Sequence, residues 1–278
     1  MKIVKPIANQ SFVIDATPAW PDIEFETDAT GSHVWSWSLV WGSFSRSGTE
    51  TTPGNKWNAK EVMTDLGGTL TVKAQAGHAG AAASAPISVL LRGTNPNAAT
   101  ITAYLAVKAG SAGFEKILEH ESKYKHFNTR NEPVKSFDNG YGMCQLTTPT
   151  PSFEQVWNWK LNIDGGLALF AQKRNAAIGY LSQGGRSYTT DQLKYEAVAR
   201  WNGGSYHEWD AKLGWVRKSS ILCDTRTGNI GWDMTDSENK DKTESELRAR
   251  DKDSYSGGRP AGAHWSYLGV CYADRILG

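Results

Sequence analysis

The sequence lacks the features that mark several classes of protein. Its 30 Lys and Arg residues almost balance 29 Asp and Glu, for a formal net charge of +1. Bulk charge therefore gives no reason to expect nucleic acid or an anionic membrane surface as a partner. No run of about eighteen apolar residues is present to span a membrane, and the first residues include no apolar run of signal-peptide length. We therefore expect a protein made in the cytoplasm without a signal peptide.

Metal-ligand patterns are also missing. The sequence has three cysteines, and neither they nor the six histidines show the ligand spacing of a metal site. We therefore expect no metal and no cofactor. Cys223 and Cys271 can pair in an oxidising compartment, or all the cysteines can be buried thiols, and the sequence leaves both open. The histidines are His33, His78, His120, His126, His207 and His264. His120 and His126 flank Glu121 and could modulate its pKa, but we favour a solvated helix face for both.

What is present is the composition of a soluble globular protein. The 278 residues are 39% hydrophobic and 21% charged, and the chain is long enough for two domains with separate cores. The 12 Trp and 10 Tyr are many for this length. Such residues pack cores, but they also form flat platforms on which sugar rings stack. The aromatic count is thus compatible with a carbohydrate-active protein without requiring one.

Residues 1–94 have the pattern of β structure. Alternation along residues 34–41 places Trp35, Trp37, Leu39 and Trp41 on one face, and similar runs follow at 70–76 and 87–91, with turn signals between them such as Gly77–Gly80. Short strands at this spacing predict an antiparallel sandwich. The tryptophan row is either the core face of a sheet or a sugar platform, and we favour the core. The pattern resembles a bacterial immunoglobulin-like domain, which implies an adaptor or targeting role.

Residues 95–278 change to helical patterns. A turn-rich exit at 91–97 is followed by an alanine-rich segment, so we place the domain boundary near residue 95. Helical periodicity predicts helices over 162–181 and from Thr190. The dense mixed-charge run at 236–253 is typical of a solvated helical face or a mobile loop, rather than of a lid or a partner site.

One segment of this second part suggests chemistry. Phe114, Ile117, Leu118 and Glu121 recur at helical spacing, so a carboxylate ends an apolar face. Burial against apolar neighbours raises the pKa of a carboxyl group, which suits a general acid near neutral pH. The following Gly140 to Thr147 segment contains glycines that let the backbone approach a ligand or the helix closely.

Five segments in order resemble the motifs of the lysozyme-like superfamily, in particular soluble lytic transglycosylases and goose-type lysozymes. They are Glu121-Ser122, Gly140–Leu146, Asn162–Gly166, Arg200–Gly204 and Tyr272–Leu277. The resemblance implies an α+β multidomain protein. An all-β immunoglobulin-like sandwich (1–94) would precede a mainly α lysozyme-like catalytic domain (95–278) with an insertion at about 207–265.

The resemblance also assigns roles to residues. Glu121 would be the general acid that protonates the departing glycosidic oxygen. Trp201 stands where the family has tyrosine, and Cys144 where it has methionine. For Ser122 simple helix-end chemistry is an alternative, and Met143 and Tyr141 are more often core and cleft wall. The implied substrate contacts are Ser122, Tyr141, Met143, Gln145, Trp201, Asn202 and Tyr272.

Two reaction outcomes remain open. Without a second carboxylate to hold water, the 6-hydroxyl of the sugar attacks and leaves a 1,6-anhydro end, as in a lytic transglycosylase. Asp138 could instead position water for hydrolysis, as in a goose-type muramidase, or could merely stabilise its Asp-Asn-Gly turn. Glu132 and Asp164 are weaker candidates. We favour the transglycosylase; a non-catalytic cell-wall-binding module is the alternative outside enzymology.

The resemblance finally implies a setting. The substrate would be the β-1,4 bond between MurNAc and GlcNAc in peptidoglycan strands. A wall-cutting enzyme without a signal peptide needs phage lysis, a phage tail or an interbacterial secretion system to reach the wall. We therefore expect an antibacterial effector or phage component that acts in the periplasm of a target cell or is secreted. An antibacterial effector would also imply a periplasmic immunity protein that plugs the cleft.

Overall fold

The computed structural model describes residues 1–77 and 82–278, so His78 and most of the expected Gly77–Gly80 turn lie outside the described residues. The chain forms two compact units. The first comprises Met1–Val107 and Glu121–Gly166, and the second comprises Lys108–His120 and Leu167–Gly278. The fold class is α+β: the described residues form 13 strands in several sheets and seven α-helices, mostly in the later half of the chain.

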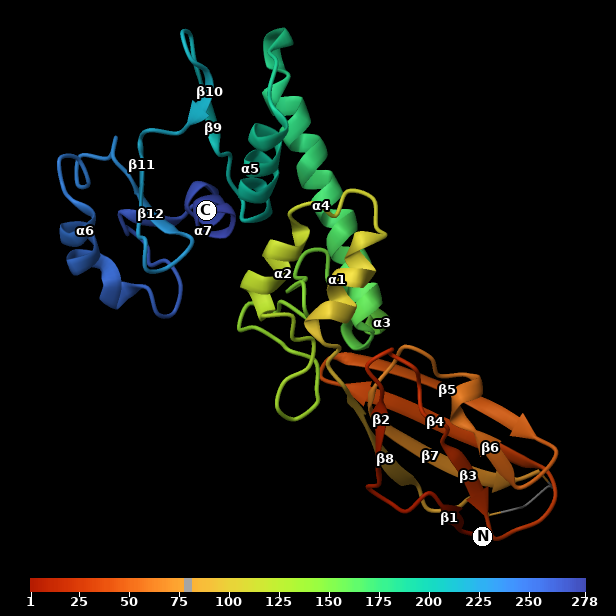
Figure 1. Ribbon diagram of the computed structural model, residues 1–278. Helices are drawn as coiled ribbons and strands as arrows, with labels where there is room; N and C mark the ends of the chain where they lie inside the picture. The colour runs from red at the N-terminus through yellow and green to blue at the C-terminus, as the bar shows by residue number, and fades with distance from the viewer. Residues whose placement is uncertain (78–81) are drawn as a thin grey trace. The chain divides into compact units, whose positions relative to one another are not determined.

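Two sheets make up the start of the first unit (Figure 1). All strand pairs in them are antiparallel except β2 with β8, which run parallel, so the expected sandwich has one parallel pair. The larger sheet has the order β2 (Ser11–Ile14), β8 (Ile87–Gly93), β7 (Gly68–Ala76), β4 (His33–Trp41) and β5 (Phe44–Thr52). The smaller has the order β1 (Ile3–Lys5), β3 (Glu24–Thr27) and β6 (Lys56–Asn58), which leads into the short η1 (Ala59–Glu61).

The tryptophan row of β4 faces the space between these sheets. Trp35 and Leu39 are fully buried, and Trp37 is 8% exposed. The ring of Trp35 stacks on that of Trp57, which belongs to the smaller sheet, at 6.0 Å between centroids. The row is therefore the core face of the sheet, as favoured from the sequence, and the prediction that it packs a core is confirmed.

The same hydrophobic core continues into residues 121–166. It includes Phe127, Tyr141, Phe153, Val156 and Trp157 together with the residues of the sheets. At Gly67 an added Cβ would lie 2.1 Å from the indole of Trp157, so only glycine allows the backbone to pack this closely. The core thus extends beyond the boundary expected near residue 95.

The first unit also contains two whole helices and the start of a third. They are α1 (Ala98–Ala106), α3 (Phe153–Trp157) and the start of α4 (Trp159–Leu181). α4 begins at Trp159 rather than at Asn162 because the side-chain oxygen of Asn158 accepts the backbone N–H of Lys160 at 2.9 Å and caps an earlier start. The indole of Trp159 donates to the carbonyl of Ala16 at 3.0 Å, which attaches the helix to the N-terminal segment.

The second unit contains the remainder of α4, most of α2 (Phe114–Ser122), α5 (Thr190–Trp201) and α7 (Gly269–Leu277). α5 begins where the sequence indicates, because Thr189 and Gln192 form a reciprocal capping box. The segment between α5 and α7 is rich in strands: a hairpin of β9 (His207–Asp210) and β10 (Gly214–Arg217), and a three-stranded sheet. That sheet has the order β11 (Ile221–Cys223), β12 (Ile230–Asp233) and β13 (Trp265–Tyr267), while η2 (Gln183–Gly185) follows α4.

The mixed-charge run contains helix α6 (Glu244–Asp251), followed by η3 (Lys252–Ser254). Leu247 is fully buried in a small core with Ile230, Trp232 and Trp265. Arg248 bonds Asp224 at 2.6 Å and also pairs with Glu244. The expected solvated helix is therefore only partly solvated, because Leu247 is buried and Arg248 pairs with Asp224, which follows β11.

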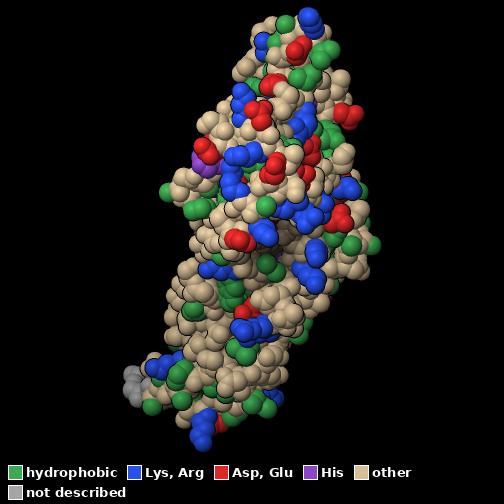
Figure 2. All heavy atoms as spheres, turned by 90° about the vertical axis from the view of Figure 1, so that its left-hand side faces the viewer, with side chains coloured by type: hydrophobic (Ala, Val, Ile, Leu, Met, Phe, Trp, Pro, Cys, Tyr) green, Lys and Arg blue, Asp and Glu red, His purple; other side chains and the backbone are tan. Residues whose placement is uncertain are grey.

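On the face drawn in Figure 2, acidic and basic side chains are interspersed, in keeping with the near-zero net charge. Within residues 1–77 and 82–278, no helix is long and apolar enough to cross a membrane.

Candidate active site

The glycine-rich segment is held by two buried side chains of the first unit. Asn162 donates its side-chain N–H to the carbonyl of Tyr141 at 3.1 Å and accepts the backbone N–H of Cys144 at 2.9 Å. His126 accepts the backbone N–H of Met143 at 3.2 Å through Nδ1. Both side chains are fully buried. The turn between residues 141 and 144 is therefore fixed from both sides.

His126 must be neutral to do this. Burial lowers its pKa to about 3, although the hydrogen bond with the carbonyl of Val156 acts in the opposite direction. The Nε2 atom lies 2.9 Å from that carbonyl oxygen and so carries the proton, which leaves Nδ1 free to accept. The sequence had suggested a solvated helix face for His126. That interpretation is wrong, because α2 ends at Ser122 and the chain then turns into the core.

Gly142 lies between Asn162 and His126, where only a glycine fits. Its φ is +69°, and an added Cβ would lie 2.6 Å from both Asn162 Nδ2 and His126 Cε1. Close approach of backbone to buried polar groups is a typical use of glycine. Gly142 thus serves the approach of the backbone to Asn162 and His126, whereas the sequence had pointed to a ligand or to the preceding helix.

Glu121 lies close to this segment in the first unit. It is the penultimate residue of α2 and is half-buried rather than enclosed. Burial raises the pKa of the Cys144 thiol, and the negative charges of Glu121 and Asp164 raise it further. The Glu121 carboxylate is therefore within electrostatic reach of Cys144, in the middle of the glycine-rich segment. Ser122, also half-buried, ends the helix.

The other predicted contacts of the first unit differ in exposure. Met143 is fully buried, and Tyr141 is 5% exposed with its ring edge-on to Trp41 and Phe44. Both therefore belong to the core rather than to the implied set of substrate contacts. Gln145 is half-buried with φ +51°, and its Nε2 donates to the carbonyl of Gly142 at 2.7 Å.

The candidate second carboxylates have structural partners. Asp138 is exposed in a turn, where Asn139 has φ +64° and the hydroxyl of Ser136 donates to the carboxylate. Glu132 lies 3.3 Å from Arg92, and Asp164 accepts the hydroxyl of Tyr104 at 2.9 Å. The hydrogen bond between Ser136 and Asp138 lies within the turn, so it fits the turn-stabilising role of Asp138.

The three remaining predicted residues belong to the second unit. Trp201 is half-buried, and its ring meets Phe114 at 5.5 Å and Phe170 at 6.3 Å. Asn202 ends α5, and its buried Nδ2 has no hydrogen-bond partner in the described parts of the chain. Tyr272 is 2% exposed and lies edge-on to His120 at 5.2 Å. The structure thus groups Glu121 with the glycine-rich segment, and these three residues with the second unit.

Sequence reasoning missed a buried ion pair in the second unit. Glu196 is fully buried and accepts the backbone N–H groups of Tyr206 and His207 at 2.9 and 3.0 Å, while Arg200 lies 2.8 Å away. Burial alone would raise the pKa of Glu196, but the hydrogen bonds from His207 and Tyr206 and the charge of Arg200 lower it overall. Glu196 therefore joins α5 to β9, and the i, i+4 spacing of Glu196 and Arg200 was the signal in the sequence that could have found the pair.

The structure pairs two of the three cysteines. Cys223 and Cys271 form a disulfide between β11 and α7, and Cys144 is a free, buried thiol. Among the residues that the structure describes, no three His, Cys, Asp or Glu side chains gather so that they could hold a metal ion. No family model matches the chain, and the search of curated proteins found no match either.

Proposed function

We propose that this protein is a peptidoglycan-cleaving lytic transglycosylase with an immunoglobulin-like sandwich and a lysozyme-like catalytic part. One observation carries the proposal: Glu121, the penultimate residue of α2, is within electrostatic reach of the glycine-rich segment that His126 and Asn162 hold. The order of the five motif segments in the sequence adds to it. Gln145 and Ser122 remain the proposed substrate contacts beside Glu121 in the first unit.

The proposed reaction needs one carboxyl group. Glu121 gives its proton to the GlcNAc O4 atom as the bond from MurNAc C1 to that oxygen breaks. The 6-hydroxyl oxygen of the same MurNAc then bonds to C1, and its proton returns to Glu121. No water is consumed, and the product carries a 1,6-anhydro end. The half-buried position of Glu121 supports this role, since the carboxyl group can meet both a substrate and the core.

The hydrolytic alternative has less support. It requires a carboxylate that holds water across the sugar, and Asp138 was the candidate. Asp138 is instead exposed, and Ser136 bonds its carboxylate within the turn. We therefore prefer the transglycosylase outcome.

The disulfide supports the proposed setting. Disulfides persist in oxidising compartments such as the periplasm and outside the cell. A chain with the Cys223–Cys271 bond would suit delivery to the periplasm by a secretion system or phage particle, where an immunity protein could protect the producing cell by plugging the cleft.

The test compares two substitutions on one helix. Glu121→Gln removes the proton donor and keeps the side-chain shape, so we expect wall clearing to fall by about a hundredfold or more. Glu119→Gln makes the same change at an exposed position of α2 and should leave clearing intact. Purified variants with equal thermal midpoints would be compared by turbidity loss of isolated cell walls. Full activity in Glu121→Gln would reject the proposal, and tight wall binding without turnover in the wild-type chain would favour a binding module.

A further inference from the structure

The second unit contains a cavity of about 570 Å³. Ligand pockets typically measure about 300–1,000 Å³, so this one can hold a small molecule or a few residues of a peptide. One face of α7 forms a wall, because its lining residues recur at helical spacing: Cys271, Asp274, Arg275 and Gly278. Residues of the segment from Arg217 to Gly228 and Glu244 of α6 form the remaining walls.

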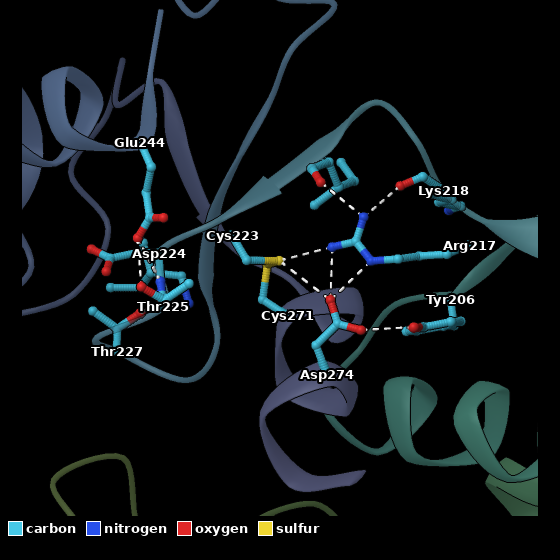
Figure 3. The surroundings of a disulfide bond; sticks show 12 residues. Tyr206, Arg217, Lys218, Cys223, Asp224, Thr225, Thr227, Glu244, Cys271 and Asp274 are labelled. Atoms are coloured by element: carbon cyan, nitrogen blue, oxygen red, sulfur yellow. Dashed lines mark hydrogen bonds and ion pairs between the residues drawn. A yellow bond between two sulfur atoms is a disulfide. The ribbon is translucent and has the colours of Figure 1, made fainter. Parts of the chain in front are cut away.

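The disulfide lies in the middle of this site. Figure 3 shows it between two polar clusters, one around Arg217 and Asp274 and the other around Asp224 and Glu244. The covalent bond joins α7 to β11, so these two lining segments are fixed to each other before any ligand arrives. Ile221 and Leu222 add apolar lining. The cavity is therefore pre-formed, with an apolar middle and polar ends.

Each carboxylate at this cavity already has partners. Asp274 accepts Arg217 Nη2 at 2.7 Å and the hydroxyl of Tyr206 at 2.7 Å (Figure 3). Asp224 accepts two N–H groups of Arg248, at 2.9 and 2.6 Å.

Glu244 completes the set of carboxylates. It accepts the backbone N–H and the hydroxyl of Thr225 at 2.9 and 2.8 Å, and it pairs with Arg248 as well. These carboxylates thus form part of the wall and do not attract a cation strongly.

Arg275 is the exception among the charged lining residues. It is exposed, and it has no hydrogen bond or ion pair with any residue in the described parts of the chain. Its stem packs near Gly228, where an added Cβ would lie 3.3 Å from Arg275 Cγ and 3.3 Å from His120 Cε1. An exposed guanidinium that is bonded to no anion can offer its N–H donors to a carboxylate.

We propose that this cavity binds the carboxylate end of a short peptide, with Arg275 on the carboxylate and the disulfide, Ile221 and Leu222 against small apolar side chains. The peptide can come from two sources: free in solution, or as the stem that branches from a glycan strand. The second source rests on the proposed function.

The probe is N-acetyl-D-alanyl-D-alanine, which has one carboxylate and small apolar side chains, together with its C-terminal amide. Calorimetry on the full chain should show binding of the acid, and binding at least about tenfold weaker for the amide, because a charge-assisted pair is lost. Arg275→Gln should lower the affinity for the acid by the same factor, and Arg275→Lys should lower it by less. Arg226→Gln removes an exposed arginine that lies between β11 and β12 and does not line the cavity, and it should leave binding unchanged. Equal binding of acid and amide, no binding at all, or unchanged affinity in a folded Arg275→Gln variant would overturn the proposal.

Turnover separates the two sources. If the stem is the ligand, the wild-type chain cleaves stem-bearing strands faster than strands stripped of peptide, and Arg275→Gln removes that difference. Equal turnover of both strands alongside peptide binding assigns the site to a free peptide. Absence of any turnover would reject the proposed function alone, since the calorimetric result stands independently.

Discussion

The indole of Trp41 meets the ring of Tyr141 edge-on, with 6.1 Å between the ring centroids. The first residue ends strand β4 of the larger sheet, and the second lies inside the glycine-rich segment of the candidate site. Trp157 approaches the same indole at 5.9 Å. The part of the chain expected to carry chemistry is therefore packed on the sheets through one aromatic cluster, and the stability of each depends on the other.

Substitution at Gly67 tests this shared core. Gly67→Ala places a methyl group against the Trp157 ring, so we expect a loss of about 1–3 kcal/mol in the free energy of unfolding. Gly54→Ala is the matched control, because nothing lies within 4 Å of its added Cβ. Denaturant unfolding of both variants, followed by tryptophan fluorescence, measures the difference. Equal stability of the two would show that the Trp157 contact contributes little.

The pH dependence of the first unit should report His126. Its pKa is lowered to about 3 in the folded protein, against 6.5 for the unperturbed side chain. Between these values the unfolded chain takes up a proton that the native state refuses, so stability falls as pH falls, by up to about 1.4 kcal/mol per pH unit. His126→Gln removes the titration and should flatten the slope between about pH 6.5 and 5, above the range in which carboxylates titrate. An unchanged slope in that variant would contradict the buried, neutral imidazole.

Asp138 separates the two reaction outcomes. Asp138→Asn keeps an oxygen that can accept from Ser136, so the turn should survive. For a transglycosylase we expect near-normal turnover and 1,6-anhydro ends in mass spectra of the products. A water-positioning base would make the same change cost about a hundredfold or more in rate, and the wild-type products would be heavier by one water.

The disulfide should stabilise the second unit. It closes a sequence separation of 48 residues, and loop-closure entropy predicts a contribution of about 4 kcal/mol, with about 2–4 typical of measured cases. Thermal unfolding with and without reductant measures it in the wild-type chain. The Cys223→Ala/Cys271→Ala double variant is the control, since reductant should not change its midpoint. If reductant leaves the wild-type midpoint unchanged, the bond does not hold α7 and β11 together in solution.

Local features of the fold could be predicted from the sequence because their cause is local. Alternation in residues 34–41 indicated which face of β4 is buried, and the polar residues before Leu193 marked the start of α5 at Thr190. Burial of α6 was more difficult to predict from the sequence, because Leu247 is its only large apolar residue.

The sequence by itself determined the β-rich first part and the helices that follow, because strand alternation, helical periodicity and capping depend on neighbours in the chain. Only the tertiary structure decided which residues hold the site. His126 and Asn162 fix the glycine-rich turn from 17 and 18 residues away, and Arg217 reaches Asp274 across 57 residues. Such partners meet only when a shared core brings distant segments together. The residue type at one position does not show which distant residue it will contact.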